Sequence, residues 1–363
     1  MSVAVIDLFA GAGGFSLGAH RLTDEVVGIE LARDAVATQD CAGMTCEMAD
    51  ITSLDPVVHD PRNEVPETHL HLHASPPCQT FSAAGKGAGR THIEVLSQAA
   101  YEILTYGFTG VDLSDVPEGS LLVLEPARWV WEIRPDSISL EQVRSVLPLW
   151  EAYAVGLEGL GYDAWAALLH SEQYGVPQTR TRAWLGASLH RPVEAPAPTH
   201  SRYHVRDPLR LDEGVLPWVS MAEALGKARS WSHYAPAGVS QKSHPASPRK
   251  LDEAPAPTVT AVGNHYFFNP EVDTFGENLT WEHQRPSTTV CGDPRLSGPG
   301  RNDPTVSGSQ YGANARKITI EEAGVLQGFP ADYPWQGTKT SQFRQAGNAV
   351  CPAVAEAVLR SVL

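Results

Sequence analysis

Short apolar runs alternate with helical patterns in the first half of the chain. Val3–Phe9 is an apolar run that ends in glycines, which is typical of a strand buried in a parallel sheet. A helix is predicted to start at residues 15–20, and residues 147–160 have the apolar spacing of a helix that stops at Gly161. Further strands are predicted at 26–30, 70–74 and 121–124. This alternation predicts an α/β class with a doubly wound, mostly parallel sheet and helices on both faces.

The pattern changes in the second half. Residues 188–315 have little helical periodicity, and they repeat a proline, a β-branched patch and a glycine, which predicts short strands and long loops. Regular structure resumes at 318–329, and a last helix is predicted around 352–362. We therefore predict three parts: an α/β domain at 1–187, a smaller irregular domain at 188–315, and a segment at 316–363 that completes the first domain.

Composition indicates a globular chain without a membrane segment. Hydrophobic residues make up 42% and charged residues 19% of 363 residues. No apolar run approaches the roughly 18 residues of a membrane span. The amino terminus has no basic region before its apolar stretch, so no secretory signal is expected and a cytoplasmic location is predicted.

The net charge of −15 is unevenly distributed. Residues 1–170 hold 8 Lys+Arg and 24 Asp+Glu, a charge of −16, whereas residues 171–363 hold 19 and 18, a charge of +1. A surface that binds phosphates is therefore expected in the second half, where local contacts matter more than total charge. The alternative, which charge alone favours slightly, is an acidic solvated face beside a neutral lobe.

Five cysteines are present, and no two are spaced as CxxC. The odd number and the spacing predict neither a disulfide framework nor a metal site, and at least one thiol is expected to be free.

Residues 7–18, DLFAGAGGFSLG, predict a strand, a glycine turn and a helix. Glycines allow a ligand to approach the backbone closely, although a dinucleotide loop or a plain tight turn fits as well. Glu30 ends the second strand, where a carboxylate can accept hydrogen bonds from ribose hydroxyls. Asp50 follows a third strand, where it could contact an adenine amino group. Either acid could instead cap a helix, but together with the loop they favour a nucleoside-containing ligand.

Cys78 lies in SPPCQTFS (75–82), where two prolines stiffen the approach to the thiol. A thiolate is a strong nucleophile, and its pKa falls near cations or a helix amino terminus. A buried structural cysteine is the commoner fate of a lone cysteine, but the stiff polar setting argues against it here.

Six segments in this order resemble the motifs of the DNA (cytosine-5-)-methyltransferase family. The resemblance covers Val3 to about Leu185 and Arg316 to Leu363, and it leaves out the middle domain. The segments are 7–18, the Pro-Pro-Cys-Gln stretch, Glu125, QYGVPQTRTR (173–182), EEAGVLQGFP (321–330) and QAGNAV (345–350).

The resemblance implies a covalent mechanism. Cys78 would add to carbon 6 of cytosine, which makes carbon 5 able to accept a methyl group. Glu125, in an apolar setting with a raised pKa, would hold ring nitrogen 3. Arg182 would bind the ring carbonyl, and Arg180 would support it. Without this context, the two arginines would read as alternate positions on a surface strand.

The resemblance also implies S-adenosylmethionine as the methyl donor and S-adenosylhomocysteine as its product. Phe9 would pack on adenine, Glu30 would contact the ribose, and Asp50 with Ile51 would read the adenine. Pro77 would stand near the reacting methyl, and Asn348 beside the methionine part. The full set of implied cofactor residues is Phe9, Ala10, Gly11, Gly13, Gly14, Glu30, Leu31, Asp50, Ile51, Pro77, Asn348 and Ala349.

Double-stranded DNA is the implied partner, because such enzymes rotate the target base out of the stack into the pocket. Lys86 and Arg90 flank a glycine-rich loop and could close over phosphates, or they could belong to a solvated loop. The middle domain, with twelve Lys and Arg residues between Arg191 and Arg301, would read the flanking sequence. The implied DNA contacts are Gln79, Ser82, Lys86, Arg90 and Gln178. We expect no metal and no membrane partner. We expect a monomer of bacterial or phage origin that acts in a restriction-modification system.

Two positions depart from the family pattern. The usual Glu-Asn-Val is Glu125-Pro126-Ala127, and Ser75 stands where glycine is usual before Pro-Pro-Cys. Proline removes a backbone donor and an amide side chain, so the shape of the pocket, the rate and the choice of base are in question.

Three alternatives remain. A tRNA cytosine-5 methyltransferase shares the fold but typically has a smaller target module. A non-catalytic nucleic-acid-binding protein would not need Cys78, Glu125, Arg180 and Arg182 together. A nicotinamide oxidoreductase would explain the glycine loop but not Pro-Pro-Cys-Gln.

Overall fold

The computed structural model describes residues 2–77, 80–81, 91–204, 206–207, 209–226, 232–234, 267–269, 287–288 and 316–363. The chain divides into two compact units. The first unit comprises residues 1–169, 181–197 and 349–363, and the second unit comprises 170–180 and 198–348. The division at 187 and 315 that the sequence suggests stays a prediction.

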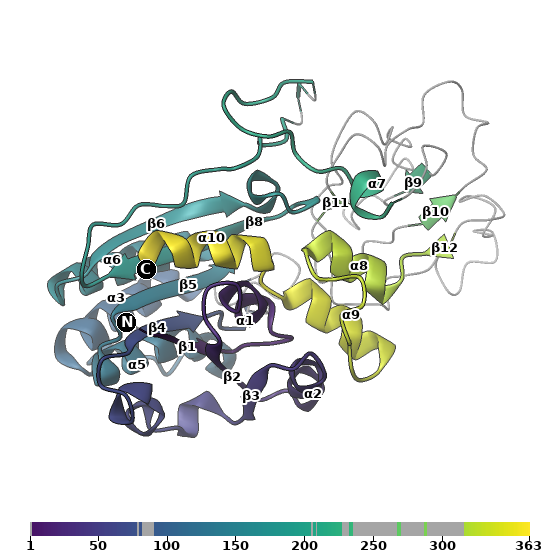
Figure 1. Ribbon diagram of the computed structural model, residues 1–363. Coiled ribbons are helices and arrows are strands. Elements are labelled where there is room, and N and C mark those ends of the chain that lie inside the picture. Colours follow the sequence, from purple (N-terminus) through teal and green to yellow (C-terminus); the bar gives the residue numbers. More distant parts are fainter. Residues whose placement is uncertain are drawn as a thin grey trace. The chain divides into compact units, whose positions relative to one another are not determined.

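A seven-stranded sheet forms the centre of the first unit, in the order β3-β2-β1-β4-β5-β8-β6 (Figure 1). The five neighbouring strands β3, β2, β1, β4 and β5 run parallel to one another, and β8 runs antiparallel to β5. The predicted fold class, a mostly parallel sheet with helices on both faces, is confirmed. The strands are β1 (Val3–Leu8), β2 (Glu25–Glu30), β3 (Thr45–Met48), β4 (His69–Ala74), β5 (Ser137–Val143), β6 (Asp163–His170) and β8 (Thr181–Ser188).

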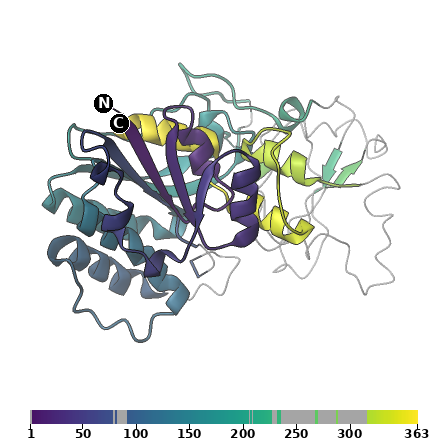
Figure 2. The same cartoon turned by 60° about the horizontal axis from the view of Figure 1, so that its bottom comes forward.

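Helices cover the two faces of this sheet (Figure 2). On one face, α3 packs on α5 and α6; on the other, α1 packs on α10. Apolar side chains fill the layers between helices and sheet, among them Leu72, Trp129 and Trp150, which are fully buried. The α-helices of this unit are α1 (Gly14–Ala19), α2 (Arg33–Cys41), α3 (Ile93–Tyr106), α4 (Glu118–Leu121), α5 (Glu125–Ile133), α6 (Leu147–Gly159) and α10 (Pro352–Val362).

Short 3-10 turns connect these elements. They are η1 (Ile51–Ser53), η2 (Pro56–His59), η3 (Pro61–Asn63), η5 (Leu122–Leu124) and η6 (Arg144–Val146). The strand predicted at 121–124 is wrong, because α4 and η5 occupy it. Val123 and Leu124 are buried beneath α3, and a short apolar run buried in this way has no periodicity that separates a strand from a helical turn.

Residues 349–363 belong to the first unit, whereas residues 316–348 belong to the second. A Cβ atom added at Gly14 would lie 2.2 Å from the carbonyl oxygen of Val350, and one at Gly18 would lie 2.5 Å from that of Pro352. Only glycine lets α1 approach the start of α10 so closely. Residues separated by more than three hundred positions therefore pack backbone to backbone.

Three buried histidines of β4 are joined to serines of β5. His69 and His71 are each hydrogen-bonded to Ser137, at 2.9 and 2.8 Å, and His71 and His73 to Ser139, at 2.9 and 2.8 Å. Burial lowers the pKa of His71 to about 3 and that of His73 well below its usual value. The imidazoles of His71 and His73 are thus neutral at pH 7 and bonded to serines within the sheet, while Nε2 of His73 has no hydrogen-bond partner among the described residues.

The second unit holds short elements around a pair of helices. They are η7 (Ser171–Tyr174), β7 (Gln178–Thr179), α7 (Met221–Ala224), β9 (Ser232–Tyr234), β10 (Phe267–Asn269), β11 (Ser287–Thr288), β12 (Arg316–Lys317), α8 (Ile320–Gln327) and α9 (Lys339–Asn348). β12, β10 and β9 form one sheet, and β11 pairs with β7. Much of the predicted irregular domain lies outside the described residues.

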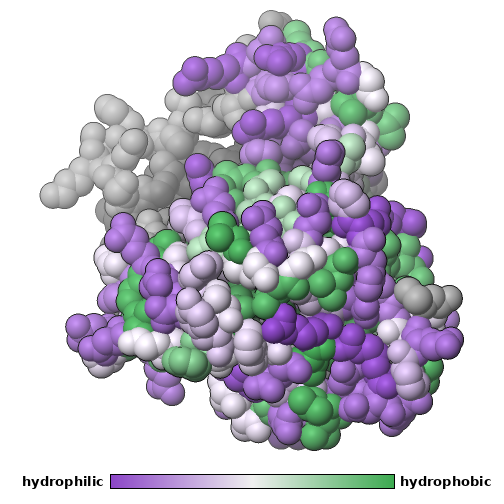
Figure 3. Space-filling model, turned by 90° about the vertical axis from the view of Figure 1, so that its left-hand side faces the viewer, coloured by the Kyte–Doolittle hydropathy of each residue, from purple (hydrophilic) through white to green (hydrophobic). Residues whose placement is uncertain are grey.

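The surface view in Figure 3 shows hydrophobic residues in small groups among hydrophilic ones. Among the described residues, no helix is both long and apolar enough to cross a membrane.

Candidate active site

The glycine loop after β1 is held by Glu30 at the end of β2. The N–H of Gly11 donates to one carboxylate oxygen of Glu30 at 2.8 Å, and the N–H of Ala32 donates to the other at 2.7 Å. Phe9 and Gly11 have φ of 59° and 56°, so the loop takes a left-handed turn that favours glycine. Among the described residues, a Cβ atom added at Gly11 would meet only the Phe9 carbonyl, at 4.0 Å. The backbone there leaves room for a ligand.

Asp7 lies in β1 just before this loop and is fully buried. The Ser16 hydroxyl donates to its carboxyl group at 2.7 Å. Burial raises the pKa of Asp7 to about 7, an effect that the Ser16 hydrogen bond partly offsets. Our sequence reasoning did not single out Asp7, although an acid inside the apolar run Val3–Phe9 was a signal that could have identified it.

Asp50 caps the 3-10 turn η1. Its carboxylate accepts hydrogen bonds from the N–H of Thr52 at 3.0 Å and from the Thr52 hydroxyl at 2.8 Å, and Ile51 is buried beside it. The capping role that the sequence left open is therefore present. It does not conflict with an adenine contact, because one carboxylate oxygen can accept several hydrogen bonds.

The segment on either side of Cys78 is fixed in the first unit. Ser75 donates from its hydroxyl to the Phe9 carbonyl at 3.3 Å, and the Gln142 amide donates to the carbonyl of Pro76. Beyond the cysteine, Ser145 donates to the carbonyl of the buried Phe81 at 3.0 Å. Cys78, Gln79, Ser82, Lys86 and Arg90 themselves lie outside the described residues.

Glu125 begins α5 and forms an ion pair with Arg128 at 2.7 Å. On this side the carboxylate faces a guanidinium group, not the apolar wall expected from the sequence. Pro126 stands in the first turn of the helix, where the missing N–H would have no intrahelical partner. The departure at Pro126 is thus compatible with the local backbone.

Arg182 in β8 pairs with the buried Glu141 of β5, with 3.0 Å between Nε and the carboxylate. The antiparallel register places Arg182 opposite Val143, near the carboxyl end of β5. This pairing across strands holds the guanidinium end of the Arg182 side chain.

In the second unit, Gln178 and Arg180 link β7 to the carboxyl-terminal helices. The buried Gln178 amide donates to the Leu326 carbonyl at 3.0 Å and to the Gln327 side chain at 2.7 Å. Arg180 donates to the Gly347 carbonyl at 3.0 Å. A DNA contact by Gln178 would require these bonds to be exchanged, and it stays a prediction.

A family model for C-5 cytosine-specific DNA methylase matches residues 3–105 and 114–363. The chain belongs to this family. The predicted enzyme class, a DNA (cytosine-5-)-methyltransferase, is thereby confirmed. The family is dependent on S-adenosylmethionine and acts on DNA.

Curated relatives and solved structures agree with this assignment. The type II methyltransferase M1.HphI of Haemophilus parahaemolyticus is 26% identical over the whole chain and 87% of its own length. M.DdeI of Desulfomicrobium norvegicum is 27% identical over 99% of the chain and 88% of its own length. A DNA modification methyltransferase from an Escherichia coli prophage has a TM-score of 0.52 at 18% identity, covering 99% of this chain and 98% of that one. The Dnmt2 methyltransferase of S. pombe has a TM-score of 0.54 at 15% identity with the same coverage. These structures share the fold.

The predicted site residues of this methylase divide between the two units. The first unit holds Glu125, Arg182 and all the predicted cofactor residues except Asn348. Asn348, at the end of α9, belongs to the second unit, as do Gln178 and Arg180. Within the first unit, direct bonds join Gly11 to Glu30 and Phe9 to Ser75. The predicted roles of these residues stay predictions.

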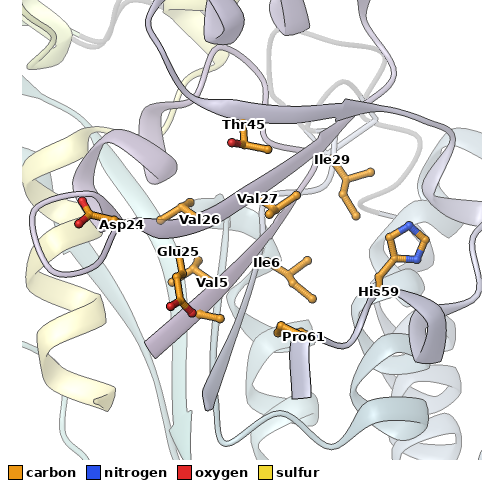
Figure 4. Close-up of a pocket in the computed structure, with 11 residues that line it drawn as sticks. Val5, Ile6, Asp24, Glu25, Val26, Val27, Ile29, Thr45, His59 and Pro61 are labelled. Atoms are coloured by element: carbon orange, nitrogen blue, oxygen red, sulfur yellow. The ribbon is translucent and has the colours of Figure 1, made fainter. Parts of the chain in front are cut away.

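The first unit also contains a cavity and a cluster of possible metal ligands. A cavity of about 310 Å³ lies against β1 and β2, with Val5, Ile6 and Ile29 among its apolar lining and Glu25 and His59 among its polar lining (Figure 4). None of the predicted site residues that the structure describes lines this cavity.

His69, Asp136 and His190 have side-chain ligand atoms within 4.8 Å of one another, close enough to share a metal ion. Asp136 already bonds His190 at 2.6 Å, the N–H of Leu70 at 2.9 Å and Arg62 at 3.4 Å, so these contacts account for the cluster.

Proposed function

We propose that this methylase transfers the methyl group of S-adenosylmethionine to carbon 5 of a flipped-out cytosine in duplex DNA, through a covalent adduct with Cys78 at a specific short sequence. The observation that carries the proposal is the family match over nearly the whole chain, with Cys78 in its Pro-Pro-Cys-Gln segment. The curated relatives are type II methyltransferases, which favours a restriction-modification role in a bacterial or phage-encoded protein. We expect this protein to be cytoplasmic and monomeric.

The residues of the first unit fit the methyl donor. Within the described residues, only the Phe9 carbonyl comes near an added Cβ at Gly11, which would leave room for the methionine part, and the Glu30 carboxylate stands at the end of β2, where a ribose would bind. Leu31 is 65% exposed, so its apolar side chain is available to cover an adenine ring. When bound, S-adenosylmethionine supplies an electrophilic methyl group.

The protein groups would act on the cytosine ring. The Cys78 thiolate adds to carbon 6, while Glu125 holds nitrogen 3 and Arg182 binds the ring carbonyl as negative charge develops. Carbon 5 would then bond to the methyl group of the donor as its carbon–sulfur bond breaks, and S-adenosylhomocysteine would leave. Loss of the carbon 5 proton to a base and elimination of the Cys78 thiolate restore the double bond and the enzyme. Arg180 supports Arg182 in this scheme.

The nucleophile can be tested with Cys78→Ala and the matched control Cys41→Ala, since Cys41 is an exposed free cysteine. We expect 5-methylcytosine to appear at one short sequence when the wild-type chain or the Cys41 variant is expressed in a methylation-free host. The Cys78 variant should produce none, because no other group replaces the attacking sulfur, yet it should still bind duplex DNA. The measurements are methylome sequencing and a gel-shift assay.

Trapping gives a second readout of the same step. Duplex DNA with 5-fluorocytosine, together with S-adenosylmethionine, should form an adduct at Cys78 that survives denaturation, because fluorine cannot leave as the proton does. Methylation by the Cys78 variant, or active wild-type protein without any adduct, would refute the covalent mechanism.

A further inference from the structure

Arg128 makes four hydrogen bonds that connect Glu125 to a distant turn. It lies three residues after Glu125 on α5, so the two side chains share one side of the helix. Its Nε and one terminal nitrogen donate to the same oxygen of Glu125, at 2.9 and 2.7 Å. Its terminal nitrogens also donate to the carbonyls of Leu54 at 3.1 Å and Ile51 at 2.9 Å. Ile51 is the first residue of η1, and Leu54 directly follows it.

The turn that receives Arg128 is itself well fixed. Asp50 caps it through two hydrogen bonds from Thr52, and the side chain of Ile51 is buried in the core. The guanidinium therefore joins the first turn of α5 to an anchored segment about seventy residues earlier in the chain. That segment carries Asp50 and Ile51, the residues proposed to contact adenine.

The bonding pattern leaves one side of the carboxylate available. Arg128 uses only Oε2 of Glu125, and within the described part of the chain no donor reaches Oε1. A planar guanidinium with five donors in a fixed fork can hold a carboxylate and two carbonyls at once, whereas the compact ammonium of lysine cannot reproduce that geometry.

We propose that Arg128 is a positioning residue, which fixes the Glu125 carboxylate so that Oε1 faces the cytosine ring and ties it to the segment that binds adenine. This inference rests on the proposed function. The pair is partly exposed, with 31% of the Arg128 and 18% of the Glu125 side chain accessible, so its contribution to folding stability is small. Its main effect is on orientation.

The test is a double-mutant cycle on the full-length protein, with Arg128→Gln, Glu125→Gln and both together. Methyl transfer to unmethylated genomic DNA is measured to give kcat and the KM values for DNA and S-adenosylmethionine. Arg128→Gln should lower kcat by about 10-fold to 100-fold, the range expected when a reacting group is misplaced by about 1 Å. The KM values should change much less. In the Glu125→Gln background, Arg128→Gln should lower kcat no further, because its effect on kcat is transmitted through that carboxylate.

Two more variants make the result specific. Arg128→Lys, which keeps the charge and loses the fork, should recover only part of kcat. Arg360→Gln breaks a helical Arg–Glu pair in α10, at 2.9 Å to Glu356, and should leave kcat unchanged. The inference would be overturned if the kcat loss of the double variant equalled the product of the two single losses, or if Arg128→Lys were fully active. Either result would leave the proposed function intact. A wild-type chain that transfers no methyl group would remove both.

Discussion

Asp7 shows how the surroundings of a side chain determine its pKa. It is sealed beneath the glycine loop, with Ser16 as its hydrogen-bond donor. Its pKa rises from 3.8 to about 7, so near neutral pH the folded protein keeps a proton that the unfolded chain has released. The carboxyl group therefore contributes stability below pH 3.8, and this contribution is lost as the pH rises through about 7.

The substitution Asp7→Asn removes this titration and keeps an acceptor for Ser16. As the pH rises from 4 to 8, we expect the free energy of unfolding of the variant to increase relative to that of the wild type, by up to about 4 kcal/mol. Urea unfolding at stepped pH measures the difference. Curves for the two proteins that stay parallel across this interval would contradict a buried, protonated Asp7.

The two departures from the family pattern are also explained one residue at a time. Ser75 replaces glycine and uses its hydroxyl to bind the Phe9 carbonyl, which joins the Pro-Pro-Cys segment to the glycine loop. Pro126 replaces asparagine in the first turn of α5, where a proline is tolerated. Each change therefore has a compatible local structure.

At the scale of elements, the pairing of β4 with β5 depends on the ladder of histidines and serines. A strand with histidine at every second position would expose them on an ordinary sheet, yet here these side chains are buried. Hydrogen bonds to Ser137 and Ser139 offset their desolvation only while the imidazoles are neutral. This makes the sheet sensitive to acid.

The substitution His71→Gln tests this sensitivity. The pKa of His71 is about 3 in the folded protein, against 6.5 for the free side chain, so only the unfolded chain gains a proton between these values. The wild type should lose stability as the pH falls from 6.5 toward 3. The variant, although less stable at pH 7, should lose less over the same interval. Thermal unfolding at half-unit steps gives both slopes, and equal slopes would rule out the ladder as an acid-labile element.

At the scale of the whole chain, the first unit is closed by its last helix. Gly14 and Gly18 of α1 meet the backbone of Val350 and Pro352, so the unit requires both ends of the sequence. Backbone atoms cannot move aside as flexible side chains do. The closure is consequently intolerant of even a methyl group.

We expect Gly14→Ala to destabilise the protein by about 1–3 kcal/mol, because the added Cβ would overlap the Val350 carbonyl. Gly159→Ala is the matched control, since a Cβ at the end of α6 meets no described atom within 4 Å. That change should be neutral or slightly stabilising, because alanine favours a helix. Urea unfolding of both variants measures the difference, and equal stabilities would argue against this close approach.

The sequence by itself determined the class of fold, several elements and the family. The apolar runs that became β1, β2 and β4, and the helical patterns that became α6 and α10, are local signals that depend on neighbouring residues. The family motifs are local as well, and they led to Cys78, Glu125 and Arg182 as candidates.

Only the tertiary structure decided how polar residues are used. β5, with the sequence SISLEQV, was not predicted as a strand, because its serines, glutamate and glutamine are buried by partners far away in the chain. Arg128 likewise finds its acceptors in Ile51 and Leu54. Hydrophobic periodicity records which side chains avoid water. It carries no information about which distant donor or acceptor allows a polar group to be buried, and that depends on the three-dimensional packing.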